Sequence, residues 1–323
     1  MSYFSDKTIL ITGGTGSFGR MFLATLLRED NPQSIRIYSR GEMLQYETEK
    51  MFPDDRIRFF IGDVRDKERL SRAMNGVDIV VHAAALKQVP TCEYNPIEAV
   101  KTNINGSINI INSALDNNVD RVIALSTDKA VHPVNLYGST KMVAEKLFIQ
   151  GNSYTGGVRH TKFSCVRYGN VIGSRGSVVP LFLEQKKTGR LTVTDERMTR
   201  FWLTLDEGVQ FVRNCLPIMY GGEIFVPKIP SMKVSDLAHS MAPDAKIEII
   251  GIRPGEKIHE ILLTEDEARH TKEFDTYFVI EPEQKFWNPK SSEGGRTLSE
   301  GFRYASDTNT HWLSIANLRE MIG

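Results

Sequence analysis

The amino-acid sequence predicts an α/β fold, a doubly wound parallel sheet with a smaller mixed α/β lobe. Three observations favour this fold. Short runs rich in β-branched residues alternate with helical patterns, a glycine triplet follows the first run, and the periodicity weakens beyond Val171. The runs are continuous rather than alternating apolar and polar, which is typical of strands covered on both faces. They span residues 8–12, 34–38, 57–63, 78–85, 121–127 and 162–170.

The same pattern predicts how the chain divides into domains. Right-handed βαβ connections bring successive strands into one sheet, so residues 1–172, with part of 203–227, are predicted to form the sheet domain. Residues 173–202 and 228–323 are predicted to form the smaller lobe and a C-terminal extension, because turn signals interrupt the strand and helix patterns there.

The charge balance limits the partners. Lys plus Arg and Asp plus Glu each total 40 in the 323 residues, so no general positive field recruits nucleic acid or an anionic membrane. No stretch approaches the roughly 18 apolar residues of a spanning helix, and the N-terminal MSYFSDKTILITGG lacks a secretory pattern. We therefore expect a cytoplasmic protein without nucleic-acid or membrane partners.

The cysteines and histidines do not predict a metal site. The three cysteines, Cys92, Cys165 and Cys215, are too few and too scattered for a disulfide framework or a Cys-x-x-Cys site. We expect reduced thiols within the packing. The seven histidines are dispersed as well, and His82 near the fourth run is interpreted as a packed residue.

A glycine-rich turn, TGGTGSFG, follows the first run and precedes the helical pattern RMFLATLLRE. Gly13, Gly16 and Gly19 permit a tight turn and close backbone approach, while the helix N-terminus offers free N–H groups and partial positive charge to a pyrophosphate. Strand, turn and helix in this order predict a Rossmann-type dinucleotide site, the alternative being a purely structural turn. The other turn residues expected to contact this ligand are Thr15, Ser17 and Phe18.

The end of the second run indicates which dinucleotide binds. NAD-dependent enzymes usually carry an acid about 20 residues beyond the glycines, but this sequence has Ser39 and Arg40 there. A guanidinium can clamp a 2′-phosphate through two hydrogen bonds, which favours NADP, unless Arg40 is a solvated loop residue. Asp63, which ends the third run, either meets the adenine amino group or caps the next helix.

A tyrosine and a lysine follow the fifth run in the segment STDKAVHPVNLYGSTK. Tyr137 and Lys141 are four residues apart and share one helix face. Beside an oxidised nicotinamide, the ring and the Lys141 ammonium are expected to lower the pKa of the Tyr137 phenol, so that it can take a proton from a sugar hydroxyl. The same segment places Asp128 directly before Lys129, which this chemistry alone does not explain.

These motifs, with HAAALKQV, RYGNVIGSRGSVVPLF, MTRFW and RPGEK, resemble the extended short-chain dehydrogenase/reductase family over most of the chain. The sequence is most similar to the inverting UDP-N-acetylglucosamine 4,6-dehydratases, the first enzymes of the pseudaminic acid route. The glycine and Tyr–Lys motifs mark only the superfamily. Asp128–Lys129 and RYGNVIGSRGSVVP point to this branch, because retaining sugar-nucleotide dehydratases generally carry Asp–Glu where this sequence has Asp–Lys.

The resemblance implies a three-stage reaction on a UDP-linked sugar, with tightly bound NADP that is not consumed. Tyr137 deprotonates the C4 hydroxyl as hydride leaves C4. The new ketone acidifies the C5 proton, which a base removes while an acid assists loss of water from C6. Return of the hydride to C6 and of a proton to the opposite face of C5 yields the inverted product, UDP-2-acetamido-2,6-dideoxy-β-L-arabino-hex-4-ulose.

Asp128 and Lys129 are the expected acid and base of the elimination, with their division of labour left open. As a base, Lys129 would need its pKa lowered from about 10.4 to between 7 and 8, at a cost of roughly 4 kcal/mol. Burial beside the cationic cofactor and Lys141 is the expected cause. Thr127 is expected to hydrogen-bond near the C4 hydroxyl. In the alternative interpretation, Asp128 orients the loop and Lys129 forms an ion pair.

The resemblance also assigns ligand contacts. Arg200 and Arg253 match arginines that bind the nucleotide diphosphate, and Glu256 is expected to take the uridine ribose hydroxyls. Arg167, Tyr168 and Gly169 are expected to help close the nicotinamide pocket. The further residues expected to bind the cofactor are Val64, Ala83, Ala84, Ala85, Lys87 and Asn170. The further residues expected to bind the substrate are Lys87, Asn170, Ser177, Val178 and Thr192.

Two other functions stay open at this point. A UDP-sugar 4-epimerase or reductase would share the fold, the cofactor and Tyr137. A regulator that senses NADP without catalysis is the non-enzymatic alternative, although it would have no use for an activated phenol. The family commonly assembles as dimers or hexamers, so a homo-oligomer is expected.

Overall fold

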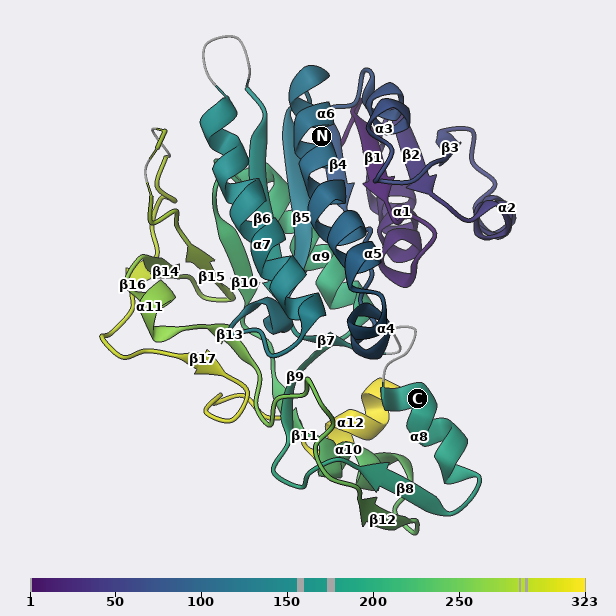
Figure 1. The fold of residues 1–323 in the computed structure, drawn as a ribbon, viewed down its shortest axis with the longest axis vertical. Helices are drawn as coiled ribbons and strands as arrows, with labels where there is room; N and C mark the ends of the chain where they lie inside the picture. Colours follow the sequence, from purple (N-terminus) through teal and green to yellow (C-terminus); the bar gives the residue numbers. More distant parts are fainter. Residues whose placement is uncertain (1, 156–159, 173–177, 285, 288–289, 323) are drawn as a thin grey trace.

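The computed structural model describes residues 2–155, 160–172, 178–284, 286–287 and 290–322 (Figure 1). A ten-stranded sheet forms the larger part of the molecule. Its strands lie in the order β16 (Arg296–Thr297), β14 (Thr271–Glu273), β15 (Tyr277–Ile280), β10 (Ile224–Pro227), β6 (Lys162–Tyr168), β5 (Arg121–Thr127), β4 (Ile79–His82), β1 (Thr8–Thr12), β2 (Ser34–Ser39) and β3 (Ile57–Ile61). From β10 to β3 all neighbours pair in parallel, which confirms the predicted parallel sheet.

Each predicted run forms a strand of this sheet. β1 and β5 begin and end at the predicted residues. β4 ends at His82, earlier than predicted, because residues 83–85 leave the strand. The last run divides at Gly169 into β6 and β7 (Asn170–Val171). A Cβ at Gly169 would lie 2.5 Å from the Phe201 Cβ, so this position needs glycine where two segments cross.

Helices cover both faces of the sheet, as expected for doubly wound strands. On one face α3 (Lys67–Met74), α6 (Gly106–Asp116) and α7 (Leu136–Gly151) pack side by side, and on the other α1 (Ser17–Glu29) contacts α9 (Leu205–Ile218) (Figure 1). The other helices outside the smaller lobe are α2 (Glu42–Met51), α4 (Val89–Tyr94), α5 (Pro96–Val100), the π-helix η1 (Lys101–Asn105), the 3₁₀ helices η2 (Asp128–Ala130) and η3 (Asn152–Tyr154), and α11 (Glu265–Ala268).

A smaller lobe lies beyond one end of the sheet and has its own hydrophobic core (Figure 1). Buried side chains of Phe182, Leu191, Trp202, Leu237 and Leu318 contribute to this core. Its elements are α8 (Val178–Lys186), β8 (Arg190–Val193), β9 (Thr199–Leu203), β11 (Ser231–Lys233), α10 (Val234–Met241), β12 (Lys246–Ile249) and α12 (Ile315–Ile322). β9 pairs with β7, so the chain passes directly from the large sheet into the lobe.

Part of the segment 228–323, which is predicted to form the smaller lobe and a C-terminal extension, extends the large sheet. β15 pairs antiparallel with β10, and β14 and β16 extend the large sheet beyond it. Phe278, Val279 and Ile280 of β15 are buried in the main core, which explains why this segment joins the sheet. β13 (Ile261–Leu263) and β17 (Tyr304–Ala305) pair separately, and their apolar residues also pack on the main core.

Several expectations about single residues hold in the structure. The three cysteines are buried and unpaired. His82 is a packed residue: its Nδ1 lies 2.8 Å from Thr12 Oγ1, and burial lowers the pKa of its imidazole to about 3.

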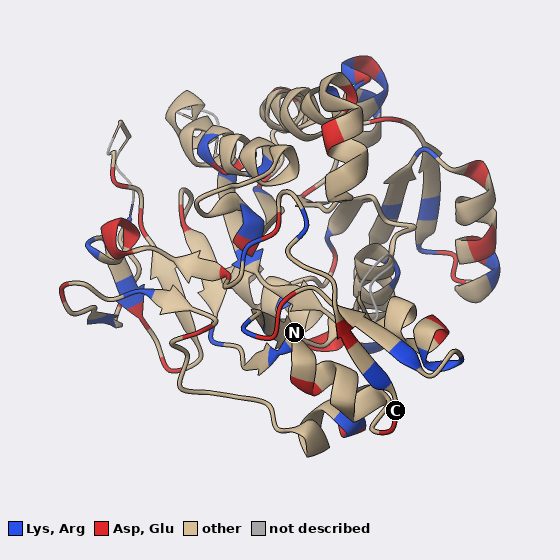
Figure 2. Ribbon diagram, turned by 60° about the horizontal axis from the view of Figure 1, so that its bottom comes forward, with Lys and Arg blue, Asp and Glu red and all other residues tan. Residues whose placement is uncertain are grey.

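Among the described residues no helix is long and apolar enough to cross a membrane. Figure 2 shows basic and acidic residues interspersed along the ribbon, in keeping with the balanced charge.

Candidate active site

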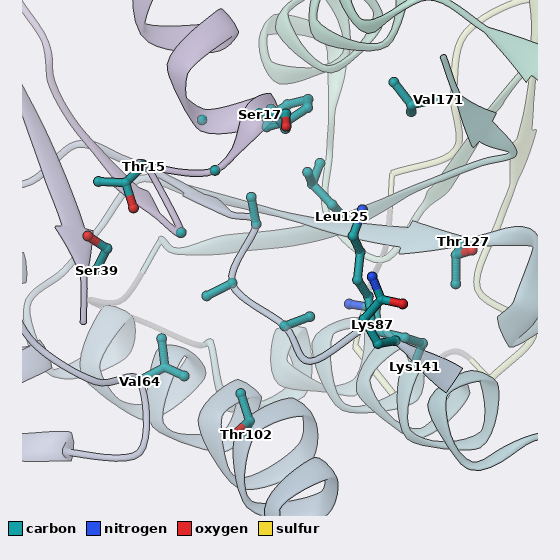
Figure 3. Close-up of a pocket in the computed structure, with 18 of the residues that line it drawn as sticks. Thr15, Ser17, Ser39, Val64, Lys87, Thr102, Leu125, Thr127, Lys141 and Val171 are labelled. Atoms are coloured by element: carbon teal, nitrogen blue, oxygen red, sulfur yellow. The ribbon is translucent and has the colours of Figure 1, made fainter. Parts of the chain in front are cut away.

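A pocket of about 740 Å³ opens where the parallel strands of the sheet end. Residues that follow β1, β2, β3, β4 and β6, and the last residues of β5, line it, so the pocket lies at the carboxyl edge of the sheet. Open α/β sheets bind their ligands at this edge. Figure 3 shows Thr15 and Ser39 at one end of the pocket and Lys87, Lys141 and Thr127 at the other.

The glycine turn has the shape that a pyrophosphate requires. Gly13 has φ +67°, and a Cβ there would lie 2.9 Å from the Ala84 nitrogen. A Cβ at Gly19 would collide with Gly14. Gly16 precedes α1 without any side-chain cap, and the first turn of α1 has no acidic residue, so its N–H groups can receive an anion. The donor set at this turn therefore fits a dinucleotide.

The residues that the sequence predicts to contact the cofactor line this one pocket, with the exception of Arg167. Arg40 has 55% of its side chain exposed and lies 3.9 Å from Asp63 Oδ2. Asp63 also pairs with Arg65 at 2.7 Å; burial opposes the charged carboxylate, but the hydrogen bonds of Arg65 lower the pKa of Asp63 overall. Asp63 does not cap α3, since Asp66 is the cap and accepts from the Arg69 N–H. The capping alternative for Asp63 is therefore wrong.

Tyr137 and Lys141 both face the pocket from the start of α7. Asn135 caps this helix by accepting the Gly138 N–H at 2.8 Å. Burial raises the pKa of Tyr137 to about 12, and burial lowers the pKa of Lys141. The predicted lowering of the Tyr137 pKa is thus not reproduced by the protein's own groups, because desolvation of the phenolate outweighs the nearby positive charge of Lys129.

Asp128 and Lys129 form a hydrogen-bonded ion pair beside these residues. Lys129 Nζ lies 2.9 Å from Asp128 Oδ1 and 3.2 Å from Asn170 Oδ1. Asp128 is fully buried, and its Oδ2 has no hydrogen-bond partner among the described residues. Thr127 lines the pocket but donates its hydroxyl to Asp128 Oδ1 at 2.8 Å. It therefore orients the acid in addition to facing the pocket.

The expected lowering of the Lys129 pKa is wrong for the protein by itself. Burial favours the neutral amine, but the carboxylates of Asp128 and Glu260 outweigh burial and raise the pKa of Lys129 above its ordinary value. Burial raises the pKa of Asp128, against the opposing charge of Lys129. The two groups therefore compete for one proton across a single hydrogen bond.

The residues expected to bind the sugar nucleotide outside this pocket are spread over the second lobe and its connections. Arg200 is buried and donates to the carbonyl oxygens of Thr199, Ile258 and Lys257, so it supports the segment 257–258. Arg253 is exposed, whereas Glu256 and Val178 are half-buried. Glu256 Oε2 has no hydrogen-bond partner among the described residues.

The last two expected substrate residues are Thr192 and Ser177. The Thr192 hydroxyl accepts a hydrogen bond from Gln185, and Ser177 lies outside the described residues.

One expected pocket residue points elsewhere. Tyr168 and Gly169 line the pocket, but Arg167 is buried in ion pairs with Glu145 at 2.7 Å and Glu267 at 2.9 Å. Side chains alternate along a strand, so Arg167 on β6 faces away from the side that Tyr168 faces. The role of Arg167 is to join α7 to the segment around α11.

The sequence also missed several residues near the site. Glu260 and Lys257 face the acid–base pair, and RPGEK signalled only the second of them. Thr102 reaches the pocket from η1, for which no local pattern exists (Figure 3). Other lining residues were not predicted as site residues, although most of them lie within the runs and motifs given above. They are Tyr38, Gly41, Leu44, Gly62, Gln88, Leu125, Ser126, Val171 and Leu205.

A doubly wound sheet, a glycine turn and a Tyr–Lys pair that face one pocket define the class of extended short-chain dehydrogenase/reductases. Within it the chain belongs to the family described as "Polysaccharide biosynthesis protein", whose profile matches residues 9–282. It is 51% identical to an inverting UDP-N-acetylglucosamine 4,6-dehydratase of Campylobacter jejuni, over 99% of this chain and 98% of the relative. The predicted resemblance is thereby confirmed.

Other relatives broaden the range of activities. A UDP-glucose 4-epimerase of Rickettsia canadensis is 39% identical over 99% of this chain and 96% of its own length. The X-ray structure of Pen from Bacillus thuringiensis superposes with a TM-score of 0.91 at 40% identity, covering 99% of this chain and 98% of that one. DesIV, a dTDP-glucose 4,6-dehydratase from Streptomyces venezuelae, shares the fold with a TM-score of 0.69 at 22% identity, covering 78% and 86%.

Proposed function

We propose that this chain is a C5-inverting UDP-N-acetylglucosamine 4,6-dehydratase, a hydro-lyase that makes UDP-2-acetamido-2,6-dideoxy-β-L-arabino-hex-4-ulose for the pseudaminic acid route. One observation carries the proposal. Lys129 Nζ lies 2.9 Å from Asp128 Oδ1, and Lys129 lines the same pocket as Tyr137 and Lys141. An acid–base pair at this place suits an elimination that follows oxidation. The high identity to the Campylobacter dehydratase supports the same assignment.

The proposed cofactor is NADP, tightly bound and recycled in each turnover. Gly13, Gly16 and Gly19 would hold its pyrophosphate, and the exposed guanidinium of Arg40 would hold the 2′-phosphate. When bound, the nicotinamide ring supplies a hydride acceptor for C4 and later a hydride donor for C6. The pocket of about 740 Å³ extends from Arg40 to Tyr137, so both ends of the dinucleotide have residues of this chain to bind them.

In the first stage Tyr137 acts as the base for the C4 hydroxyl. The protein alone holds the pKa of Tyr137 at about 12, so the phenolate needs further positive charge. The positive charge of an oxidised nicotinamide, if the pocket holds one, would lower the pKa of Tyr137. The proton of the C4 hydroxyl then moves to Tyr137, and the carbonyl at C4 makes the C5 proton acidic.

In the second stage the Asp128–Lys129 pair supplies both an acid and a base. Movement of the shared proton from Lys129 to Asp128 along the 2.9 Å hydrogen bond creates a neutral amine and a carboxylic acid together. The amine takes the C5 proton, while Asp128 protonates the C6 hydroxyl, which leaves as water. This stage ends with a Lys129 ammonium and an Asp128 carboxylate.

In the third stage a proton returns to the opposite face of C5 as C6 is reduced to a methyl group. Lys129 lies on the face from which it took the C5 proton, so the proton for the opposite face is the one that Tyr137 took from the C4 hydroxyl. Its delivery leaves Tyr137 as the phenolate and Lys129 as the ammonium beside the Asp128 carboxylate, so the protein regains its starting charge. The net change in the sugar is the loss of one water and inversion at C5.

Proton NMR of the purified protein with NADP and UDP-N-acetylglucosamine tests this function. The expected result is a new C6 methyl signal together with ring couplings that report the inverted configuration at C5. A methyl ketosugar of retained configuration, or no product, would reject the proposal. Asp128→Asn serves as a matched variant, since it keeps the side-chain shape but lacks the acid, and should form little methyl product.

A UDP-sugar 4-epimerase is the second candidate, favoured by the 39% identity to the Rickettsia epimerase. Tyr137 would serve both reactions, but an epimerase has no step for an acid–base pair such as Asp128–Lys129. The same NMR spectra distinguish the two candidates, because an epimerase product keeps its C6 hydroxymethyl group.

The proposal includes a cytoplasmic location and a homo-oligomer, dimer or hexamer. The location follows from the expected reaction on a nucleotide-activated sugar, and the assembly follows from the resemblance to the family. Size-exclusion chromatography with light scattering measures the oligomeric state directly.

A further inference from the structure

A second carboxylate, Glu260, faces Lys129 in addition to Asp128. Glu260 is 2% exposed. Its Oε1 lies 3.6 Å from Lys129 Nζ and 3.8 Å from Arg200 Nε, and its Oε2 lies 3.6 Å from Lys257 Nζ. Three cations therefore surround one buried carboxylate directly beside the acid–base pair.

The backbone holds Glu260 in this place. Its N–H donates to Ser306 Oγ at 2.9 Å, and its carbonyl oxygen accepts the Ser306 N–H at 2.8 Å. Ser306 is fully buried and its Oγ lies 2.7 Å from Thr199 Oγ1. Thr199, the first residue of β9, and Ser306, the residue after β17, thus fix the depth of the carboxylate, and its approach to Lys129 is a property of the fold.

Glu260 offsets part of the positive charge around Lys129. Arg200, Lys257 and Lys87 are the cations near the Lys129 amine, and Asp128 and Glu260 are the carboxylates. Without Glu260, these cations would face Asp128 alone, and an ammonium at position 129 would be disfavoured by its neighbours. The other titratable group that faces Lys129 is Tyr137.

We propose that Glu260 is a positioning residue for the acid–base pair, whose carboxylate holds Lys129 against Asp128 and keeps the amine in its ammonium form between turnovers. This inference rests on the proposed function only for the catalytic role of Lys129. The Coulombic attraction of Glu260, second to that of Asp128 among the carboxylates, contributes to the raised pKa of Lys129. A stored proton on Lys129 is what the pair needs before it forms an acid and a base.

A purely structural role of Glu260 predicts another effect of its removal. Glu260 would then only neutralise Arg200 and Lys257, and its loss would lower the stability of the fold without changing the protonation of Lys129. The two roles are distinguished by the proton on Lys129 itself, measured without catalysis.

The test is the pH dependence of trace acetylation of Lys129 by acetic anhydride, read by peptide mass spectrometry with the exposed Lys186 as internal standard. Only the neutral amine reacts. In Glu260→Gln the midpoint of Lys129 reactivity should fall by about one pH unit, which is about a tenfold increase in reactivity at a fixed pH below the midpoint. Glu267→Gln is the matched control, because it removes another carboxylate from a partly buried ion pair.

Equal midpoints for wild type, Glu260→Gln and Glu267→Gln would overturn the inference. Glu260→Asp covers the case in which Glu260→Gln does not fold: it withdraws the charge by one methylene and should lower the midpoint by a smaller amount, whereas a wild-type midpoint in this variant would also overturn it. If the wild type makes no methyl ketosugar but Glu260→Gln lowers the midpoint of Lys129 reactivity, the proposed function is rejected. The inference that Glu260 keeps Lys129 protonated still holds in that case.

Discussion

The backbone of Gly138 packs against the carbonyl group of Lys129 so closely that a Cβ at position 138 would overlap it. Gly138 follows Tyr137 in the first turn of α7, and Lys129 lies in η2 after β5. The base for the C4 hydroxyl and the acid–base pair for the elimination are therefore held by one backbone contact. Sequence spacing shows the two motifs as neighbours, and the structure shows that their relative position depends on a glycine.

Gly138→Ala should damage both chemistry and stability. The added methyl group must push η2 away from α7, so we expect a loss of about 1–3 kcal/mol in the free energy of unfolding. Displacement of Lys129 from Tyr137 should lower kcat about 100-fold. Urea denaturation and steady-state kinetics measure the two effects. Gly208→Ala in α9 is the control, because its new Cβ would meet only Leu203 at 3.4 Å, and unchanged kcat in Gly138→Ala would contradict the coupling.

Arg40→Ala should abolish the preference for NADP over NAD. Loss of charge-assisted hydrogen bonds to a 2′-phosphate costs about 1.5–3 kcal/mol, or about 10- to 100-fold in Kd. The Kd for NAD should change little, since NAD lacks that phosphate. Calorimetric titration with both dinucleotides gives the comparison, with Arg58→Ala as a control outside the pocket. An unaltered preference in Arg40→Ala would remove Arg40 from the NADP site.

Tyr137→Phe should lower kcat by about 100- to 10,000-fold, the usual contribution of a positioned base. Tyr137 acts in its deprotonated form and burial holds its pKa at about 12 without the cofactor. We therefore expect kcat/KM of the wild type to rise with pH until the pKa that Tyr137 has in the cofactor-bound enzyme is reached. This rise with pH should be absent in Tyr137→Phe. Tyr277→Phe, on β15 away from the pocket, is the control. A variant with full turnover would exclude Tyr137 as the base.

Glu267→Gln should destabilise the fold in a pH-dependent way. Burial opposes the charged Glu267, but Arg167 outweighs it and lowers the pKa of this carboxylate. A lowered folded-state pKa gives stability that is present above the unfolded value near pH 4.3 and is lost as the pH falls through the folded value. We expect a loss of about 3–5 kcal/mol at pH 7 that shrinks toward acid pH.

Guanidinium denaturation at a series of pH values measures this loss. Glu248→Gln is the control, because Glu248 forms an exposed pair with Arg190 at 2.7 Å and its removal should change stability by no more than about 0.5 kcal/mol. A constant difference between wild type and Glu267→Gln at all pH values would show that the charge of Glu267 does not stabilise the fold.

Local sequence patterns were sufficient to predict the large parallel sheet and the glycine turn of the pocket. Continuous apolar runs such as residues 8–12 and 121–127 form buried parallel strands, because their sequence is uniform enough to be covered on both faces. Gly13 and its neighbours were predictable for a similar reason. Their function depends on the turn that they form themselves.

Long-range contacts explain what the sequence could not predict. Glu260 meets Lys129 only because Ser306 and Thr199 fix its segment beside η2, and no spacing in the chain records that meeting. Against the effect of burial, Asp128 and then this Glu260 contact raise the pKa of Lys129, opposite to the expected direction. Arg200 is the converse case. The sequence could not predict that three carbonyl oxygens accept hydrogen bonds from its guanidinium, whereas its expected contact with the diphosphate stays a prediction.

The central claim is that Lys129 moves the C5 proton, and incubation in heavy water tests it most directly. Wild type and Lys129→Ala are each given NADP and UDP-N-acetylglucosamine, and deuterium at C5 of the sugar is followed by NMR. The account predicts one deuterium at the inverted C5 of the wild-type product and almost none in Lys129→Ala, whose turnover is also lost. Undiminished turnover and deuterium incorporation in Lys129→Ala would contradict it.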